Sequence, residues 1–160
     1  MVGNGRWWDK ARQTWRDGHD RKRPAPAELE PARTTKAERE MIVVVVSAAN
    51  QCQYCVVAHG AILRIRAKSP VIADQIATNY RKADITPKQV AMLDFAMKVS
   101  RESERLDEAD FAAMRAAGFT EEDIWDAGAV AALFALSNRM ANLTGMRPND
   151  EFDALGRSPK

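Results

Sequence analysis

The run "MIVVVVSAA", residues 41–49, constrains the fold of this chain more than any other stretch. It is nine residues long, far short of the ~20 that a membrane-spanning helix requires. Its consecutive valines would suit a strand by local propensity. However, the preceding "TKAE" fits a capping box, with Thr35 as N-cap and Glu38 reaching back to it. The rest of the chain offers no partner strands, so we expect a helix that breaks near Asn50.

The remaining start and stop signals are also helical. Proline after a threonine cap, an acidic residue three positions after a cap, and a glycine after the last apolar position mark helix ends along the chain. We therefore predict an all-α fold. Its further helices are expected from near Cys52 to Lys68, near 71–81, over 88–101, from Asp107 to Gly118, and from the "TEED" at 120–123 to about Leu143.

Length and composition predict one globular domain with an arm and a tail. The arm, residues 1–33, is basic, contains Trp8 and Trp15, and ends in a proline-rich linker. The helical domain is expected over 34–146, and a C-terminal tail, partly extended, over 147–160.

Charge and apolar length exclude several partners. The chain has 24 Lys and Arg against 22 Asp and Glu, a net charge of +2, which does not favour nucleic acid. No apolar segment is long enough to span a membrane. The N-terminus "MVGNGRWWDKARQ" lacks the apolar core of a signal peptide. We therefore expect a cytoplasmic protein, in which a cysteine pair is catalytic or metal-binding more often than structural.

Both cysteines of the chain fall in "CQYCVVAH", where Cys52, Cys55 and His59 have a C-x2-C-x3-H spacing. On a helix these three positions share one face. The two sulfurs can then approach closely enough for a disulfide, and His59 can accept or relay the proton of Cys55. Cys52 is expected in the first helical turn, where unpaired N–H groups and the helix dipole favour a thiolate. Such a pair suits peroxide reduction through a sulfenic acid.

Two other interpretations stay open on the residues alone. A structural zinc site needs four ligands, whereas this segment supplies two cysteines and one histidine, and the only other histidine, His19, lies in the arm. The third interpretation is a pair of buried structural thiols.

The stretch "ERE-MIVVVVSAANQCQYCVVAH" resembles the AhpD-like, alkylhydroperoxidase branch of the carboxymuconolactone decarboxylase family. The family's pattern is a glutamate, eleven residues, and then C-x2-C-x3-H, and here eleven residues separate Glu40 from Cys52. The segments "RKADITPKQVAMLDFAMKVS" and "AGFTEEDIWDAGAVAALFALSNRMANLTGMRPNDEF" are similar to the peroxidase-related enzymes of that family. The resemblance covers roughly residues 34–154.

The resemblance implies an AhpD-like helical bundle that forms a homo-oligomer, with the C-x2-C at the start of a helix. It implies an enzyme that reduces hydrogen peroxide or organic hydroperoxides. Cys55 would attack the peroxide, Cys52 would resolve the intermediate, and Glu40 with His59 would relay protons. The redox-active disulfide would serve in place of a cofactor or metal, and a dithiol or lipoyl-type donor would reduce it. Tyr54 is a secondary site residue, since it stands where the family type has a second histidine.

Two alternatives to this function remain. One is a non-catalytic redox-sensing or zinc-binding helical protein that uses the same residues. The other is a sibling resembling the carboxymuconolactone decarboxylases themselves, which generally lack the cysteine pair.

Overall fold

The computed structural model describes residues 34–157, so the expectations for the arm, including Trp8, Trp15 and His19, lie outside the described residues. The prediction of an all-α fold is confirmed, because every regular element within residues 34–157 is helical. No helix in this part of the chain is long and apolar enough to cross a membrane. The elements are α2 (Lys36–Ala49), α3 (Gln53–Ala67), α4 (Ile72–Asn79), η2 (Tyr80–Lys82), α5 (Pro87–Arg101), η3 (Ser103–Arg105), α6 (Glu108–Ala116), α7 (Glu121–Leu143) and α8 (Glu151–Ala154).

Helix α2 contains the β-branched run and is helical, as the capping signal predicted. Thr35 caps it, accepting from the backbone N–H of Glu38, while the Glu38 side chain accepts from the N–H of Thr35. Every residue from Met41 to Ser47 is buried. This part of the helix is therefore enclosed on all sides, and tertiary packing outweighs the strand preference of its valines.

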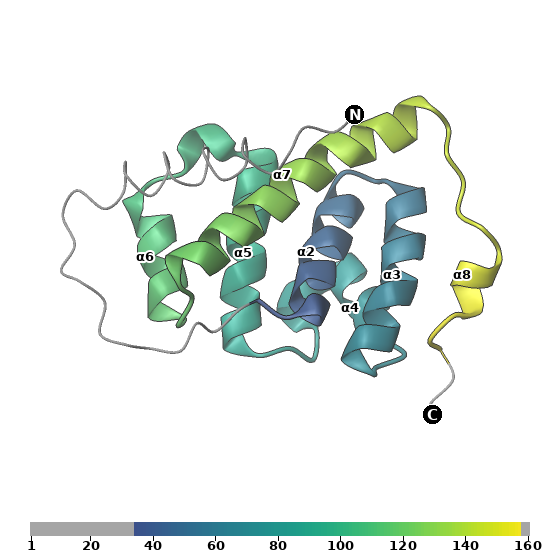
Figure 1. Cartoon of the computed structure of the whole chain (residues 1–160), viewed down its shortest axis with the longest axis horizontal. Helices are drawn as coiled ribbons and strands as arrows, with labels where there is room; N and C mark the ends of the chain where they lie inside the picture. The colour runs from purple at the N-terminus through teal and green to yellow at the C-terminus, as the bar shows by residue number, and fades with distance from the viewer. Residues whose placement is uncertain (1–33, 158–160) are drawn as a thin grey trace. The chain divides into compact units, whose positions relative to one another are not determined.

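Within residues 34–157, α2 is packed among other helices. It contacts α3, α4, α5 and α7, and Figure 1 shows the long helix α7 crossing diagonally over α5 and α2. Helix α3 runs alongside α2, with α8 beside it (Figure 1). The site described below lies where α2, α3 and α7 meet.

A tight turn joins α2 to α3. Asn50 is the C-cap of α2, and Gln51 follows with a φ of 53°, a left-handed conformation that non-glycine residues adopt uncommonly. Helix α3 then begins at Gln53, with Cys52 as its N-cap. Cys52 was expected inside the first turn, so the helix starts one residue later than the pattern placed it.

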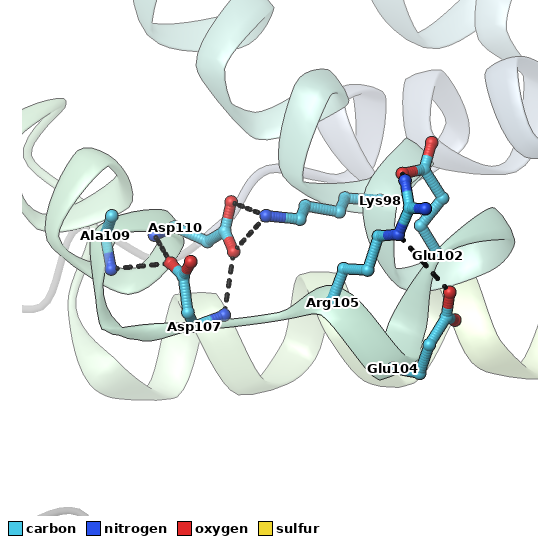
Figure 2. A network of polar contacts seen from close by, with 7 residues as sticks. All are labelled: Lys98, Glu102, Glu104, Arg105, Asp107, Ala109 and Asp110. Atoms are coloured by element: carbon cyan, nitrogen blue, oxygen red, sulfur yellow. Dashed lines mark hydrogen bonds and ion pairs between the residues drawn. The ribbon is translucent and has the colours of Figure 1, made fainter.

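Helix α6 is tied to α5 by a polar network, which Figure 2 shows. Lys98 on α5 donates to both carboxylate oxygens of Asp110, at 2.8 and 2.6 Å. Asp110 also accepts from the backbone N–H of Asp107 (2.9 Å), and Asp107 in turn caps α6 by accepting from the N–H of Ala109. The Asp107 cap and the Lys98–Asp110 ion pair therefore both stabilise the first turn of α6.

The segment after α7 runs back along α3. Gly145 takes a φ of 65° just beyond the C-cap Thr144, as predicted for a C-terminal glycine. Arg64 on α3 is buried and donates to the carbonyl oxygens of Phe152 and Leu155, at 2.8 and 2.9 Å. The tail, expected to be partly extended, thus includes the short helix α8, while the predicted domain boundaries stay predictions.

The buried carboxylate of Asp123 yields the first prediction. It accepts from the backbone N–H and hydroxyl of Thr34, at 2.7 and 3.0 Å, and from those of Thr120, at 3.1 and 2.9 Å. Asp123→Ala leaves both N–H groups without this acceptor, and we expect a loss of about 3 kcal/mol in the free energy of unfolding. The exposed cap variant Asp107→Ala should lose only about 1 kcal/mol. Equal losses in urea denaturation would contradict this.

Candidate active site

Glu40 and His59 meet between α2 and α3. The Nδ1 atom of His59 lies 2.8 Å from Oε2 of Glu40, and the Glu40 side chain is only 9% exposed. The ring of His59 stands edge-on to the Phe134 ring of α7, with 4.8 Å between centroids. The imidazole is thus held between a buried carboxylate and an aromatic ring.

The hairpin of α2 and α3 explains why these residues meet. Glu40 lies nine residues before the end of α2 and His59 six residues into α3, which places them about 13 and 9 Å from the connecting turn. Arg66, thirteen residues into α3, lies about 20 Å from that turn. Glu40 therefore faces the stretch of α3 between the other two side chains.

Arg66 is a member of this cluster that the sequence interpretation missed. Its NH1 group donates to Oε1 of Glu40 at 2.6 Å, so each carboxylate oxygen of Glu40 has its own partner. The available signal was the seven-residue interval from His59 to Arg66, about two helical turns, which puts both side chains on one face of α3.

The two thiols lie together in the core. Cys52 and Cys55 are free cysteines with exposed fractions of 0% and 2%. The backbone N–H of Cys55 donates to Sγ of Cys52, with 3.4 Å between nitrogen and sulfur. The sulfur of Cys52 therefore approaches Cys55 as an N-cap acceptor rather than from a shared helical face. His59 follows Cys55 by one helical turn on α3.

A buried amide lies behind the thiols. Asn138 on α7 is fully buried, donates to Oγ of Ser47 at 2.9 Å, and accepts from the Asn50 amide at 3.1 Å. Ser47 is a residue that the sequence interpretation missed. Ser47 stands seven residues after Glu40, so α2 turns both polar side chains to one face.

The groups around Cys55 shift the pKa of its thiol in opposite directions. The pKa of the Cys55 thiol is raised to about 11, because burial and the neighbouring Cys52 thiol raise it by more than the hydrogen bonds with Asn138 and Ser47 lower it. At neutral pH Cys55 is therefore a neutral thiol, and its use as a nucleophile requires a base to take the proton.

Tyr54 packs on this cluster. It is partly buried against the group formed by Cys52, Cys55 and Ala141. Its contact with the thiols is thus one of packing, and its predicted part in a proton relay stays a prediction. Within residues 34–157 no three His, Cys, Asp or Glu side chains are grouped so that they could hold a metal ion.

A separate cavity of about 470 Å³ lies between α5, α6 and η2. Its charged lining includes Asp94, Lys98 and Asp110, and none of the predicted site residues lines it. The ion pair of Figure 2 forms part of its wall. It is therefore distinct from the thiol site.

These features define a helical protein with a buried vicinal thiol pair one turn from a carboxylate-bound imidazole. The model of the carboxymuconolactone decarboxylase family matches residues 27–96. A solved structure from Ralstonia eutropha JMP134, described as an alkylhydroperoxidase AhpD core and an uncharacterised peroxidase-related protein, is 58% identical with a TM-score of 0.78; the match covers 94% of this chain and 75% of that one. The chain belongs to the carboxymuconolactone decarboxylase family, in its AhpD-like branch.

A second solved structure agrees with this assignment. An uncharacterised peroxidase-related protein from Silicibacter sp. TM1040 is 43% identical with a TM-score of 0.77, over 81% of this chain and 68% of that one. A search among curated proteins found no match. The family assignment therefore rests on the solved relatives, and the family model agrees with it over residues 27–96.

The amide of Asn138 yields the second prediction. Because its hydrogen bond lowers the pKa of Cys55, Asn138→Ala should move thiolate formation to higher pH and slow thiol alkylation at neutral pH. The pH dependence of thiolate absorbance in a Cys52→Ser background measures this for Cys55 alone. Asn142→Ala is the control, since Asn142 donates to the carbonyl of Asn50 one turn along α7. Identical titrations of both variants would contradict the assignment.

Proposed function

We propose that this protein is a thiol-dependent peroxidase that reduces hydrogen peroxide or organic hydroperoxides through a Cys52/Cys55 dithiol–disulfide cycle. The observation that carries the proposal is the vicinal thiol pair, with 3.4 Å from Cys55 N to Cys52 Sγ, one turn from the Glu40-bound His59. The likeness to two peroxidase-related structures supports the same chemistry.

The first step is deprotonation of Cys55. Glu40 also accepts from Arg66 and, as a carboxylate, can only accept hydrogen bonds, so Nδ1 of His59 carries the proton that it donates. The neutral ring then has Nε2 free of a proton, which suits a general base one turn from Cys55. A base is needed because burial holds the pKa of Cys55 at about 11.

The thiolate of Cys55 then attacks one oxygen of the peroxide. The O–O bond breaks, Cys55 becomes a sulfenic acid, and the imidazolium returns a proton to the departing alkoxide or hydroxide. The sulfur of Cys52 displaces water from the sulfenic acid and closes the disulfide. The thiol pair has thereby given two electrons to the peroxide.

A dithiol or lipoyl-type donor would reset the site. Its thiolate attacks one sulfur of the Cys52–Cys55 disulfide, and its second thiol resolves the mixed disulfide. A reducing compartment such as the cytoplasm would maintain this donor in its reduced form.

The peroxidase cycle yields the third prediction. One equivalent of peroxide should remove both thiols of the reduced protein and leave a Cys52–Cys55 disulfide detectable by mass spectrometry. Cys52→Ser should stop at a sulfenic acid on Cys55, which a dimedone-type reagent traps. Cys55→Ser should give neither product nor turnover with a dithiol donor.

Three outcomes would overturn this proposal. Thiols that survive peroxide in a protein purified with about one zinc per chain would favour the metal-binding alternative. A disulfide that forms without turnover in the presence of any dithiol donor would favour a redox sensor. Full turnover by Cys55→Ser would show that peroxide reduction does not need the Cys52–Cys55 disulfide.

We also propose that the protein forms a homo-oligomer through α7. Four exposed side chains, 49–77% accessible, recur at helical spacing along one face of that helix: Leu133, Leu136, Met140 and Leu143. Exposed apolar patches of this kind mark interaction sites, and the resemblance to the family points to a second copy as the occupant.

This assembly yields the fourth prediction. Leu136→Glu places a charge in the middle of the apolar face and should reduce the mass measured by light scattering toward that of a monomer. Ile65→Glu, a change at an exposed apolar residue of α3, is the matched control and should leave the mass unchanged. A wild-type protein that is monomeric at all concentrations would refute the assembly.

A further inference from the structure

We propose that Arg66 is a positioning residue of the Glu40–His59 pair, one that keeps the Glu40 carboxylate turned toward the imidazole and limits how strongly it holds the imidazolium. The inference rests on the proposed function, in which His59 acts as the base for Cys55. It is argued from the division of the two Glu40 oxygens between two donors.

The contacts of Arg66 are directional. Its NH1 group donates to Oε1 of Glu40 at 2.6 Å and also lies 3.4 Å from the carbonyl oxygen of Lys36 in the first turn of α2. Oε2 is thereby left to His59, at 2.8 Å. A carboxylate held by one donor alone could rotate, whereas two donors on separate oxygens fix its plane.

Burial makes the cation necessary. The Glu40 side chain is 9% exposed, while Arg66 is 39% exposed, so the carboxylate is buried and its cationic partner reaches solvent. A buried carboxylate without a cation is costly, and when His59 is neutral Arg66 is the positive group that contacts Glu40. Arg66 therefore stabilises Glu40 in the state in which His59 can accept a proton.

The charge of Arg66 sets the direction of its effect on His59. Glu40 from α2 and the uncharged Phe134 ring from α7 contact the imidazole, and Cys55 lies one turn away on α3. Removing Arg66 leaves the negative charge of Glu40 opposed by the imidazolium alone. The ring would then hold its proton to higher pH, and less of it would be available as a base at neutral pH.

Three variants test this inference. Arg66→Met removes the charge, whereas Arg66→Lys keeps it, and because NH1 alone makes both contacts, one ammonium group can replace it in part. Arg157→Met is the matched control, since Arg157 is 46% exposed and pairs at 2.7 Å with Asp74, outside the site. The readouts are the NMR titration of His59, assigned in a His19→Gln background, and the rate of peroxide-driven thiol loss against pH.

For Arg66→Met we expect the His59 titration and the rate profile to move up by about half a pH unit, with a roughly threefold slower reaction at neutral pH. Arg66→Lys should recover most of the wild-type profile, and Arg157→Met all of it. In a Glu40→Gln background Arg66→Met should have no further effect on the rate, because Arg66 acts through Glu40.

The outcomes separate this inference from the proposed function. The role of Arg66 would be overturned if Arg66→Met and Arg157→Met gave the same profiles. It would also be overturned if Arg66→Met had its full effect in the Glu40→Gln background. Neither result would contradict the proposed peroxidase function. A wild-type protein whose thiols survive peroxide would overturn the proposed function, and the His59 titration would still decide whether Arg66 acts on the pair.

Discussion

The burial of the middle of α2, from Glu40 to Ser47, is the constraint on which the rest of the structure depends. Each residue from Met41 to Ser47 is enclosed, by contacts that α2 makes with α3, α4, α5 and α7. Burial of each large apolar side chain contributes roughly 1.5–3 kcal/mol to stability. A helix exposed on one face would lose this contribution for every apolar side chain on that face. A helix that is apolar all round requires neighbours on every side, and the bundle supplies them.

The same burial creates the site. The apolar run is bracketed by Glu40 and Ser47, seven residues apart, and both side chains are buried with it. Buried polar groups require partners, so α3 supplies His59 and Arg66 to Glu40, and α7 supplies Asn138 to Ser47. Two of these partners also lie near the thiols: His59, one helical turn from Cys55, and Asn138, which hydrogen-bonds with Cys55.

Burial also keeps the Cys55 thiol protonated, so the site needs a group that can remove the proton. A thiol in this core is protonated at neutral pH, because desolvation raises the pKa of Cys55 to about 11. The amide of Asn138 and the hydroxyl of Ser47 offset part of the rise, and the thiol remains protonated with them in place. The imidazole held by Glu40, one turn along α3, is in place to complete the proton transfer.

The amino-acid sequence by itself determined the helices, because capping residues such as Thr35, Thr86 and Thr120 act locally and their signals survive in any environment. The spacing of Glu40, Cys52, Cys55 and His59 also stood in the sequence as a pattern. Only the tertiary structure decided the partners across helices: Arg66 on Glu40, and Asn138 on Ser47. It decided as well that Cys52 caps its helix and that burial raises the Cys55 pKa. These contacts and the burial of Cys55 depend on which helix faces pack together. The packing follows from the need to bury the apolar part of α2, and local residue preferences do not determine it.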